Sequence, residues 1–387
     1  MMPIVHLARR IASRVSRKTG GFSFDRPLVL LQSDDWGRVG VRDREGWDEL
    51  HAAGLALGQH PYDYYSLETA DDVAAIHEVL TSHRDSEGRT PRLVMNFCVA
   101  NLDFERIAQS EFQSLFLQHM SQGPPGKWNR PGLLEAYRQG IAAGVFYPAL
   151  HGATHFCRAA MERHLNHDSD RGRLLRTLWQ AETPYIHWRT PWIGFEYWDR
   201  ERTPEFLPAS IQHELVREAA ARFVEWFRVQ PLSACAPGYR AHAHTHRAWS
   251  GCGIRVAQNG PSLTPPHFDG SGLLHTYRTL EIEPALDPRP DALERCLQRA
   301  AYCFDRGLPA IVSLHSINFH STLKDFRSTT LRLLDQFLAA LEHTYRDLVY
   351  LHDLELHDML QAIQLESAAK KRSAVHVQTA PLVGGMQ

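Results

Sequence analysis

Runs of consecutive apolar residues recur along the chain, and they predict buried strands. The first run, residues 27–33, leads directly into Asp34, Asp35, Trp36 and Gly37. A short run without polar interruption is typical of a strand that is covered on both faces. Further runs of this kind predict strands at residues 92–99, 145–150, 232–236, 254–258, 274–282, 309–314 and 347–351.

Between these runs, apolar residues return every three to four positions, which is the period of a helix. Residues 208–228 show this period, with Ile211, Leu215, Ala219 and Phe223 on one predicted face. The same period predicts helices at residues 68–83, 132–144, 158–182, 290–305 and 325–345. Strands that alternate with helices are typical of βα units around a parallel sheet, either open or closed into a barrel.

The two ends of the chain differ from residues 25–365, which we interpret as one domain. Residues 1–20 hold five basic residues and no acid, and their apolar positions recur at helical spacing. Segment 1–24 is therefore predicted to contain a basic amphipathic helix, which packs on the domain, frays, or contacts an anionic membrane surface through residues 1–18. Residues 366–387 mix Ser, Ala, Lys and Gly and are predicted to be a disordered tail.

Composition and charge exclude several classes of protein. The 387 residues include 42 Lys and Arg against 44 Asp and Glu, and a net charge of −2 disfavours nucleic acid as the main partner. No apolar stretch approaches the roughly 18 residues of a membrane-spanning helix. The six cysteines form no CxxC pair, and no signal-peptide pattern is present. We therefore expect a cytoplasmic protein, with membrane association through residues 1–18 as the one reservation.

Polar residues follow several predicted strands directly, and the chain is rich in histidine, with 23 in all. Asp34 and Asp35 follow the first strand, His151 and His155 follow the third, and His315 ends a late one. Because residues at the carboxyl ends of parallel strands face one site, we expect these side chains to lie together. The i,i+4 spacing of the two histidines predicts that both rings lie on one helical face, as a metal requires.

One carboxylate with two imidazoles leaves coordination positions open, which is typical of a catalytic rather than a structural divalent site. Histidine nitrogens favour zinc or a similar transition metal over magnesium or calcium. The second carboxylate of the Asp34-Asp35 pair is then free to act as a base toward water. The sequence therefore predicts a hydrolytic site with one divalent ion, most simply zinc.

Taken in order, these motifs resemble those of the polysaccharide deacetylase family with the NodB-homology domain, a carbohydrate esterase type. They are a strand followed by Ser-Asp-Asp-x-Gly, then HxxxH, then a loop at Pro237, then a late strand ending Leu-His. The resemblance covers about residues 25–360. It implies a distorted (β/α) barrel of about seven strands, which removes N- or O-linked acetyl groups from sugars with a divalent metal, commonly zinc.

By this resemblance, Asp34 is the catalytic base and His315 the general acid. Asp35, His151 and His155 are implied to be the metal ligands.

A second set of residues is predicted to bind the saccharide or its reacting carbonyl. A backbone N–H near Gly238 or Tyr239 is expected to hold the oxyanion. Trp36, beside the metal loop, either walls the pocket or packs in the core. The predicted substrate-binding residues are Trp36, Pro237, Gly238, Tyr239 and Arg240.

The sequence also departs from the family pattern. Cys235 stands where the family has an arginine that contacts the base, and Arg240 is the candidate to replace it. The Asp of the family's fourth motif has no clear match, and Asp269 and Glu283 are the candidates. The insertion at about residues 158–230 is long compared with a minimal domain.

Two further clusters allow two interpretations each. Residues 185–198 are rich in aromatic side chains, which either stack on sugar rings or pack in the core of the insertion. His242, His244 and His246 alternate at strand spacing, which indicates a surface strand or loop, or one ring that approaches the site.

These observations predict a metal-dependent hydrolase that removes acetyl groups from a saccharide or polysaccharide. The first alternative is a glycosidase on a related barrel, which the adjacent carboxylates disfavour because neighbouring side chains on a strand point apart. The second is a non-catalytic barrel that binds sugar or scaffolds an envelope-polysaccharide assembly, which the departure at Cys235 favours.

Overall fold

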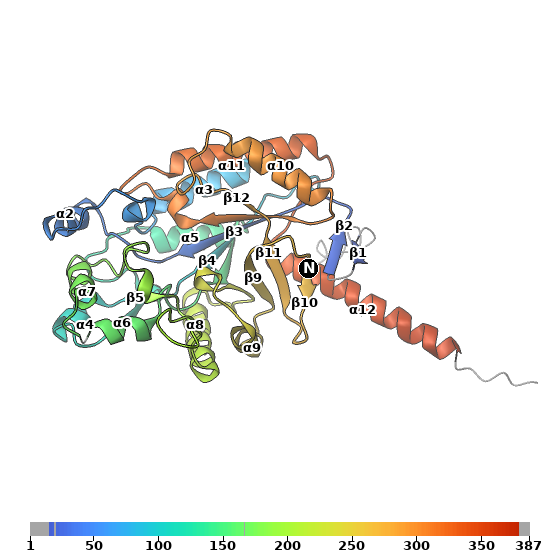
Figure 1. Cartoon of the computed structure of the whole chain (residues 1–387). Helices are drawn as coiled ribbons and strands as arrows, with labels where there is room; N and C mark the ends of the chain where they lie inside the picture. The colour runs from blue at the N-terminus through green and yellow to red at the C-terminus, as the bar shows by residue number, and fades with distance from the viewer. Residues whose placement is uncertain (1–14, 19–20, 166, 379–387) are drawn as a thin grey trace, which may run out of the picture.

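The computed structural model describes residues 15–18, 21–165 and 167–378, and it confirms an α/β protein with a central parallel sheet (Figure 1). The strand order is β10-β11-β9-β8-β7-β4-β3-β13-β12, and β14 also pairs with β3. Neighbouring strands run parallel except β10 and β11. The strands are β3 (Leu28–Trp36), β4 (Leu93–Phe97), β7 (Phe146–Leu150), β8 (Ser233–Cys235), β9 (Val256–Pro261), β10 (His267–Phe268), β11 (Leu274–Arg278), β12 (Leu280–Glu281), β13 (Ala310–His315) and β14 (Val349–Tyr350).

Strand β3 forms the centre of the sheet. It pairs with β13 along one edge and with β4 and β14 along the other, and each of its residues is buried. This environment explains the apolar run Leu28–Leu31 with which the strand begins. The strand predicted at residues 27–33 is therefore confirmed, and it continues through Asp34 and Asp35 to Trp36.

The predicted strand at residues 274–282 is two strands that serve different edges of the sheet. Its first part, β11, pairs with β9, and its second part, β12, pairs with β13. Thr279 lies between them, and its N–H donates to the Ile311 carbonyl while its hydroxyl accepts from the Ile311 N–H at 2.8 Å. We call this junction the Thr279 seam. The chain itself connects the two edges here, and closure into a seven-stranded barrel stays a prediction.

Helices lie on both sides of the sheet, as a parallel sheet requires. Figure 1 shows α10 and α11 on the side opposite α8 and α9. The helices are α2 (Arg44–Ala52), α3 (Ala70–Ser82), α4 (Phe104–Gln109), α5 (Leu133–Ala142), α6 (Arg158–Leu165), α7 (Asp170–Gln180), α8 (Ala209–Phe227), α9 (Ala243–Gly251), α10 (Ala292–Phe304), α11 (Arg327–Thr344) and α12 (Asp353–Gln378). None of the helices in the described chain combines the length and apolarity needed to cross a membrane.

Two predicted elements in the middle of the chain differ from the structure. The helix expected at residues 158–182 is split into α6 and α7, because Ser169 caps a new helix by accepting from the Gly172 N–H. His244 and His246 lie in helix α9 rather than on a strand. The His242 N–H donates to the Thr245 hydroxyl oxygen, so this segment begins a capped helix and not the surface strand or loop that the alternation of the three histidines indicated.

The chain ends also differ from the prediction. Val15–Lys18 is a strand, β1, which pairs with β2 (Gly21–Phe24), so this part of the expected amphipathic helix is extended. Pairing with β2 is favoured over the predicted helix because Phe22 and Phe24 of β2 are buried in the core. Residues 1–14 lie outside the described chain.

Helix α12 continues to Gln378 through much of the tail that was expected to be disordered, because Ala, Glu, Lys and Arg favour a helix. Residues 379–387 are outside the described chain.

The first residue of α12 ties the helix to two strands that carry the candidate site. Asp353 is buried, and its carboxylate accepts from Gln32 of β3 at 2.7 Å and from Ser233 of β8 at 2.5 Å. We expect Asp353→Ala to lower the free energy of unfolding by about 2–4 kcal/mol, because two buried donors lose their acceptor. Urea denaturation measures this. The control Asp358→Ala, at a half-exposed position on the same helix, should cost less than about 1 kcal/mol.

Candidate active site

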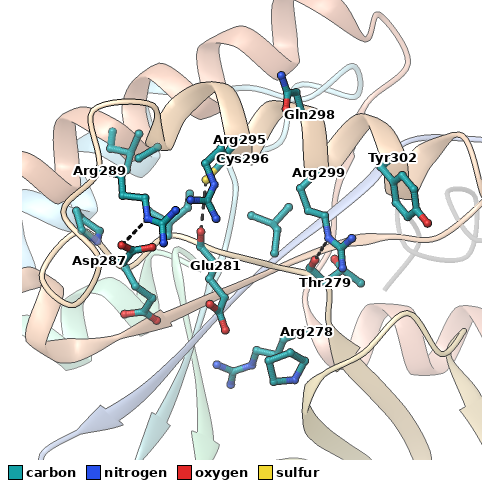
Figure 2. Close-up of a pocket in the computed structure, with 17 residues that line it drawn as sticks. Arg278, Thr279, Glu281, Asp287, Arg289, Arg295, Cys296, Gln298, Arg299 and Tyr302 are labelled. Carbon is teal, nitrogen blue, oxygen red and sulfur yellow. Dashed lines mark hydrogen bonds and ion pairs between the residues drawn. The ribbon is translucent and has the colours of Figure 1, made fainter.

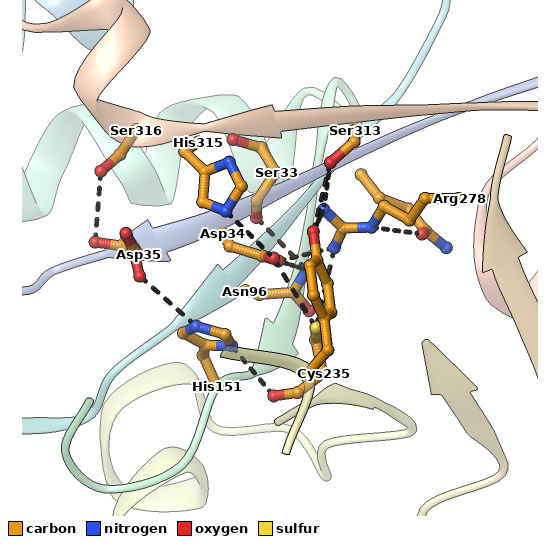
Figure 3. Close-up of polar contacts among 12 residues, drawn as sticks. Ser33, Asp34, Asp35, Asn96, His151, Cys235, Arg278, Ser313, His315 and Ser316 are labelled. Carbon is orange, nitrogen blue, oxygen red and sulfur yellow. Dashed lines mark hydrogen bonds and ion pairs between the residues drawn. The ribbon is translucent and has the colours of Figure 1, made fainter. Parts of the chain in front are cut away.

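The residues that the sequence singled out meet at the carboxyl end of the sheet (Figure 3). Asp34 and Asp35 lie at the end of β3, and His315 lies directly beside Asp34 at the end of β13. His151 begins the loop after β7, and Cys235 ends β8. The topology therefore brings together side chains from four strands, as the predicted parallel sheet required.

Three of these side chains converge on one point. Asp35 Oδ1 lies 3.4 Å from His151 Nε2 and 3.1 Å from His155 Nε2, and the three ligand atoms lie within 4.8 Å of one another. All three residues are buried. Asp35 Oδ1 and His151 Nε2 are also buried without a hydrogen-bond partner among the described residues. Buried polar atoms are normally satisfied, so this donor set fits a divalent ion.

The histidine pair reaches this point from a loop and not from a helix. Residues 151–157 have no helical structure, so the predicted i,i+4 face is wrong although the predicted pair is brought together. Gly152 has φ 81°, a left-handed conformation that glycine adopts without strain. The turn at Gly152 therefore folds the loop so that His155 returns toward His151.

Each candidate ligand is oriented by a partner behind it. His151 Nδ1 lies 2.9 Å from the Cys235 carbonyl, which can only accept, so Nδ1 carries the proton and Nε2 is free to bind. His155 Nδ1 lies 2.6 Å from the Tyr185 hydroxyl. Partners of this kind fix the ring orientation and tautomer of histidine ligands in metal sites.

Arg38 is a site residue that the sequence analysis missed. Its guanidinium donates to Asp35 Oδ2 at 2.8 Å and lies over the rings of Tyr65 and Tyr185. Burial would raise the pKa of Asp35, but Arg38 and His155 hold it well below its usual range. Asp35 is therefore ionised and offers only its Oδ1 to the convergence point.

The backbone of Asp35 is held in an uncommon conformation. Its φ is 75°, in the left-handed region that residues with a side chain rarely adopt. The Tyr65 hydroxyl donates to the Asp35 carbonyl at 2.8 Å, and the Ser316 hydroxyl donates to it at 3.3 Å. These bonds stabilise the bend that separates the Asp34 and Asp35 carboxylates.

Asp34 is paired with an arginine from a distant strand. Arg278 of β11 donates to Asp34 Oδ1 at 2.6 Å, and Asn96 donates to the same oxygen at 2.8 Å. Burial raises the pKa of Asp34, but Arg278, His151 and His315 together outweigh it and the pKa is lowered. Arg278 is therefore the arginine that contacts Asp34, whereas the guanidinium of the predicted candidate, Arg240, lies over Trp198 at 4.8 Å.

His315 is paired with the second candidate for the missing motif. Its Nδ1 lies 2.6 Å from Glu283 Oε1, and its Nε2 lies 3.9 Å from Asp34 Oδ2. Burial alone would lower the pKa of His315, but Glu283 and the two aspartates raise it to about 9. Asp269 instead contacts His275 at 3.3 Å, so Glu283 is the acid that meets His315.

The predicted substrate-binding residues divide into two groups. Trp36 is fully buried and stacks on Phe319 at 5.7 Å, so it packs in the core and does not wall a pocket. Pro237 is also buried, whereas Gly238 is exposed. The Tyr239 N–H donates to the Ala236 carbonyl at 2.8 Å, which leaves Gly238 as the backbone candidate for an oxyanion.

The aromatic segment at residues 185–198 also divides. Tyr185, Tyr197 and Trp198 are buried. The half-buried Phe195 lies beside His155, with ring centroids 5.4 Å apart, and His187 lies 5.7 Å from Phe195. Part of the segment packs in the core, and part leads outward from a candidate ligand.

Glu196 holds the loop that carries both histidines, and it was not predicted as a site residue. Its Oε1 accepts from the Ala153 N–H at 2.8 Å and from the Thr154 N–H at 3.1 Å. A side chain at Gly152 would collide with this carboxylate. The signal available in the sequence was an acid within an aromatic, buried segment, which alone does not indicate its partner.

The pKa of Glu196 predicts how stability changes with pH. Burial raises it from 4.5 to about 7, against the opposing effects of Arg158 and the two N–H donors. The folded protein therefore binds this proton more tightly than the unfolded chain, and this contribution to stability is lost as pH rises from 4.5 to about 7.

We expect Glu196→Gln, which keeps the accepting Oε1, to become more stable relative to wild type as pH rises from 5 to 8, by about 2–3 kcal/mol. Urea denaturation of both proteins at the two pH values measures this change. The exposed Glu214→Gln is the control and should show no such trend. A constant difference between wild type and Glu196→Gln would show that Glu196 is ionised throughout.

Comparison with known proteins gives likeness only at the level of whole structures. No family model and no curated protein matches the sequence. A putative polysaccharide deacetylase from Mycobacterium smegmatis is 11% identical with a TM-score of 0.48, covering 91% of this chain and 94% of that one. A probable polysaccharide deacetylase from Pseudomonas aeruginosa PAO1 is 11% identical with a TM-score of 0.45, covering 87% and 91%. A CE4 family pseudoenzyme from Bacillus anthracis is 11% identical with a TM-score of 0.38, covering 86% and 66%. At these values, no residue role or activity is transferred to this chain.

Proposed function

We propose that this protein is a metal-dependent hydrolase that removes an acetyl group, N- or O-linked, from a saccharide. The observation that carries the proposal is the convergence of Asp35, His151 and His155 on one point. Beside this point lie Asp34, which is paired with an arginine, and His315, which is paired with a glutamate. Hydrolysis of an amide or ester needs a base for water and an acid for the leaving group, and this site holds candidates for both.

Asp35 Oδ1, His151 Nε2 and His155 Nε2 are the atoms that would hold the metal. Two imidazole nitrogens and one carboxylate oxygen favour zinc or a similar transition metal. When bound, such an ion supplies a Lewis acid that activates water and polarises the acetyl carbonyl. The Cys235 carbonyl, the Tyr185 hydroxyl and Arg38 support the proposal, because they keep the three ligand atoms pointed at one place.

Asp34 and His315 divide the proton transfers. Arg278 and Asn96 occupy Asp34 Oδ1, so Oδ2 is the oxygen that takes a proton from the attacking water. Glu283 binds His315 Nδ1, so Nε2 carries the proton that goes to the leaving amine or alcohol. The distance of 3.9 Å between Asp34 Oδ2 and His315 Nε2 supports this division, because both groups can reach one substrate.

A row of half-buried rings supports a saccharide as the substrate. Phe195 and His187 lead from His155 to Tyr62, whose ring centroid lies 5.3 Å from that of His187. Aromatic faces next to a polar site suit the apolar faces of sugar rings. The acetylated saccharide is therefore placed across these rings with its acetyl group toward His155.

Two alternatives predict different outcomes. A non-catalytic saccharide-binding or scaffolding protein was favoured by Cys235 and by the missing fourth motif, and Arg278 and Glu283 now stand in those two roles. A glycosidase would need two free carboxyl groups, whereas Asp34 and Asp35 each bind an arginine. Acetate release, reducing-end release and simple binding separate the three.

The first prediction from the proposed function concerns metal content and acetate release. Purified protein should contain close to one equivalent of a transition metal and release acetate from at least one member of a panel of acetylated saccharides. The double variant His151→Ala/His155→Ala should lose both properties, because two of three ligands are gone. Its control is His244→Ala, an exposed histidine on α9. Stoichiometric metal in the double variant would contradict the ligand assignment.

The second prediction concerns rate. Asp34→Asn and His315→Ala should each lower kcat about 10²–10⁴-fold while metal stays bound, because each removes one proton transfer. Metal content and melting temperature are measured in parallel. Near-wild-type rates in both folded variants would overturn the assignment of base and acid.

The third prediction concerns the two limbs of the pH–rate profile, which should be bell-shaped because Asp34 must be ionised and His315 protonated. Arg278→Gln removes the charge that lowers the pKa of Asp34, so the acidic limb should move to higher pH. Glu283→Gln removes the charge that raises the pKa of His315, so the alkaline limb should move to lower pH. Arg240→Gln is the control, and it should move neither limb.

A further inference from the structure

A cavity of about 600 Å³ lies between α10 and β12, outside the convergence of candidate metal ligands (Figure 2). Asp35, His151 and His155 do not line it. It shares only two residues with the candidate site, Arg278 and Glu283. Its volume lies within the range of small-ligand sites.

The cavity exists because of the Thr279 seam. Pro261 at the end of β9 and Arg278 at the end of β11 form one wall, and Leu280 and Glu281 of β12 form another. The sheet divides between these walls, and α10 covers the gap. Two contacts fasten the helix there: Arg299 donates to the Thr279 carbonyl at 2.7 Å, and the Cys296 thiol lies 3.4 Å from the Glu281 carbonyl.

Arginines of α10 supply unneutralised positive charge to this cavity. The exposed side chain of Arg295 forms no hydrogen bond or ion pair within the described part of the chain. Arg299 is anchored through Nε to a neutral carbonyl, so its charge is not neutralised by that contact. The two residues are four positions apart on one helix, so they share a face. Arg289, in the loop before α10, is paired with Asp287 at 2.7 Å.

The acids that line the cavity do not cancel these charges. Glu283 is engaged by His315 at 2.6 Å and by Asn318. Asp287 is engaged by Arg289. Figure 2 shows the Glu281 side chain pointing away from α10. The remaining groups that face the α10 side are therefore the guanidinium groups of Arg295 and Arg299.

We propose that this cavity is a binding site for a compact anionic group, a phosphate, sulfate or carboxylate, held by Arg295 and Arg299. A guanidinium matches the paired oxygens of such groups in a bidentate way. The group comes either from an acidic sugar of the saccharide substrate, which reaches the cavity past Glu283, or from a free phosphate-bearing ligand. The first source rests on the proposed function, and the second does not.

The test uses inorganic pyrophosphate as the probe, with titration calorimetry on the full chain at low salt. We expect saturable binding to wild type and at least tenfold weaker binding to Arg295→Gln/Arg299→Gln, because charge-assisted hydrogen bonds are lost. The control Arg138→Gln/Arg222→Gln removes the same charge from α5 and α8 and should bind like wild type.

Arg295→Gln alone serves as a second variant, because Arg299 also fastens α10 and its loss could unfold the helix. It should weaken binding severalfold with an unchanged melting temperature. Three results would each overturn the proposal. Wild type does not bind pyrophosphate, the double variant Arg295→Gln/Arg299→Gln binds it as tightly as wild type, or the control variant is weakened as much as the double variant.

The source of the anion is decided by kinetics with two acetylated saccharides, one neutral and one carrying a uronate. If the anion belongs to the substrate, Arg295→Gln raises KM for the acidic saccharide only, and pyrophosphate competes with it. If the anion is a free ligand, KM for both saccharides changes equally or not at all. Because pyrophosphate binding is measured without turnover, loss of the proposed deacetylase activity and loss of the anion site are observed separately.

Discussion

Two buried aspartate–arginine pairs at the end of β3 determine how the rest of the site is built. Asp34 pairs with Arg278 and Asp35 with Arg38, and all four residues are nearly inaccessible to solvent. A buried carboxylate without a partner would cost several kcal/mol or take up a proton. Each arginine therefore keeps one carboxylate ionised in the protein interior, which is the state that a base and a metal ligand both need.

The same pairs assign separate tasks to the oxygens of each carboxylate. Arg38 takes Asp35 Oδ2, so Oδ1 alone faces the histidines. Arg278 and Asn96 take Asp34 Oδ1, so Oδ2 alone faces His315. The positive charge of Arg38 also reduces the attraction of this site for a cation. Retention of an ion then depends more on the two imidazoles and on the groups that orient them.

The sequence predicted the parts of the site that belong to single strands. The apolar run before Asp34 and the strand before His315 are local patterns, and both are confirmed as strands that bring these residues together. Arg278 escaped prediction because its partner lies 244 positions away, and only the tertiary fold brings them together. Helix α9 was interpreted as a surface strand or loop because its histidines alternate, and its first turn is instead capped by contacts between His242 and Thr245. Such partners follow from packing and not from periodicity.

The Thr279 seam connects the site with the cavity at α10. Because side chains alternate along a strand, ending β11 at Arg278 directs that guanidinium to Asp34 while the next residues leave the β9 edge and join β13. The break that brings an arginine to the candidate base therefore also opens the cavity beside Glu283, the residue that holds His315. A ligand in that cavity and a substrate at the candidate metal ligands would then share one wall of the protein.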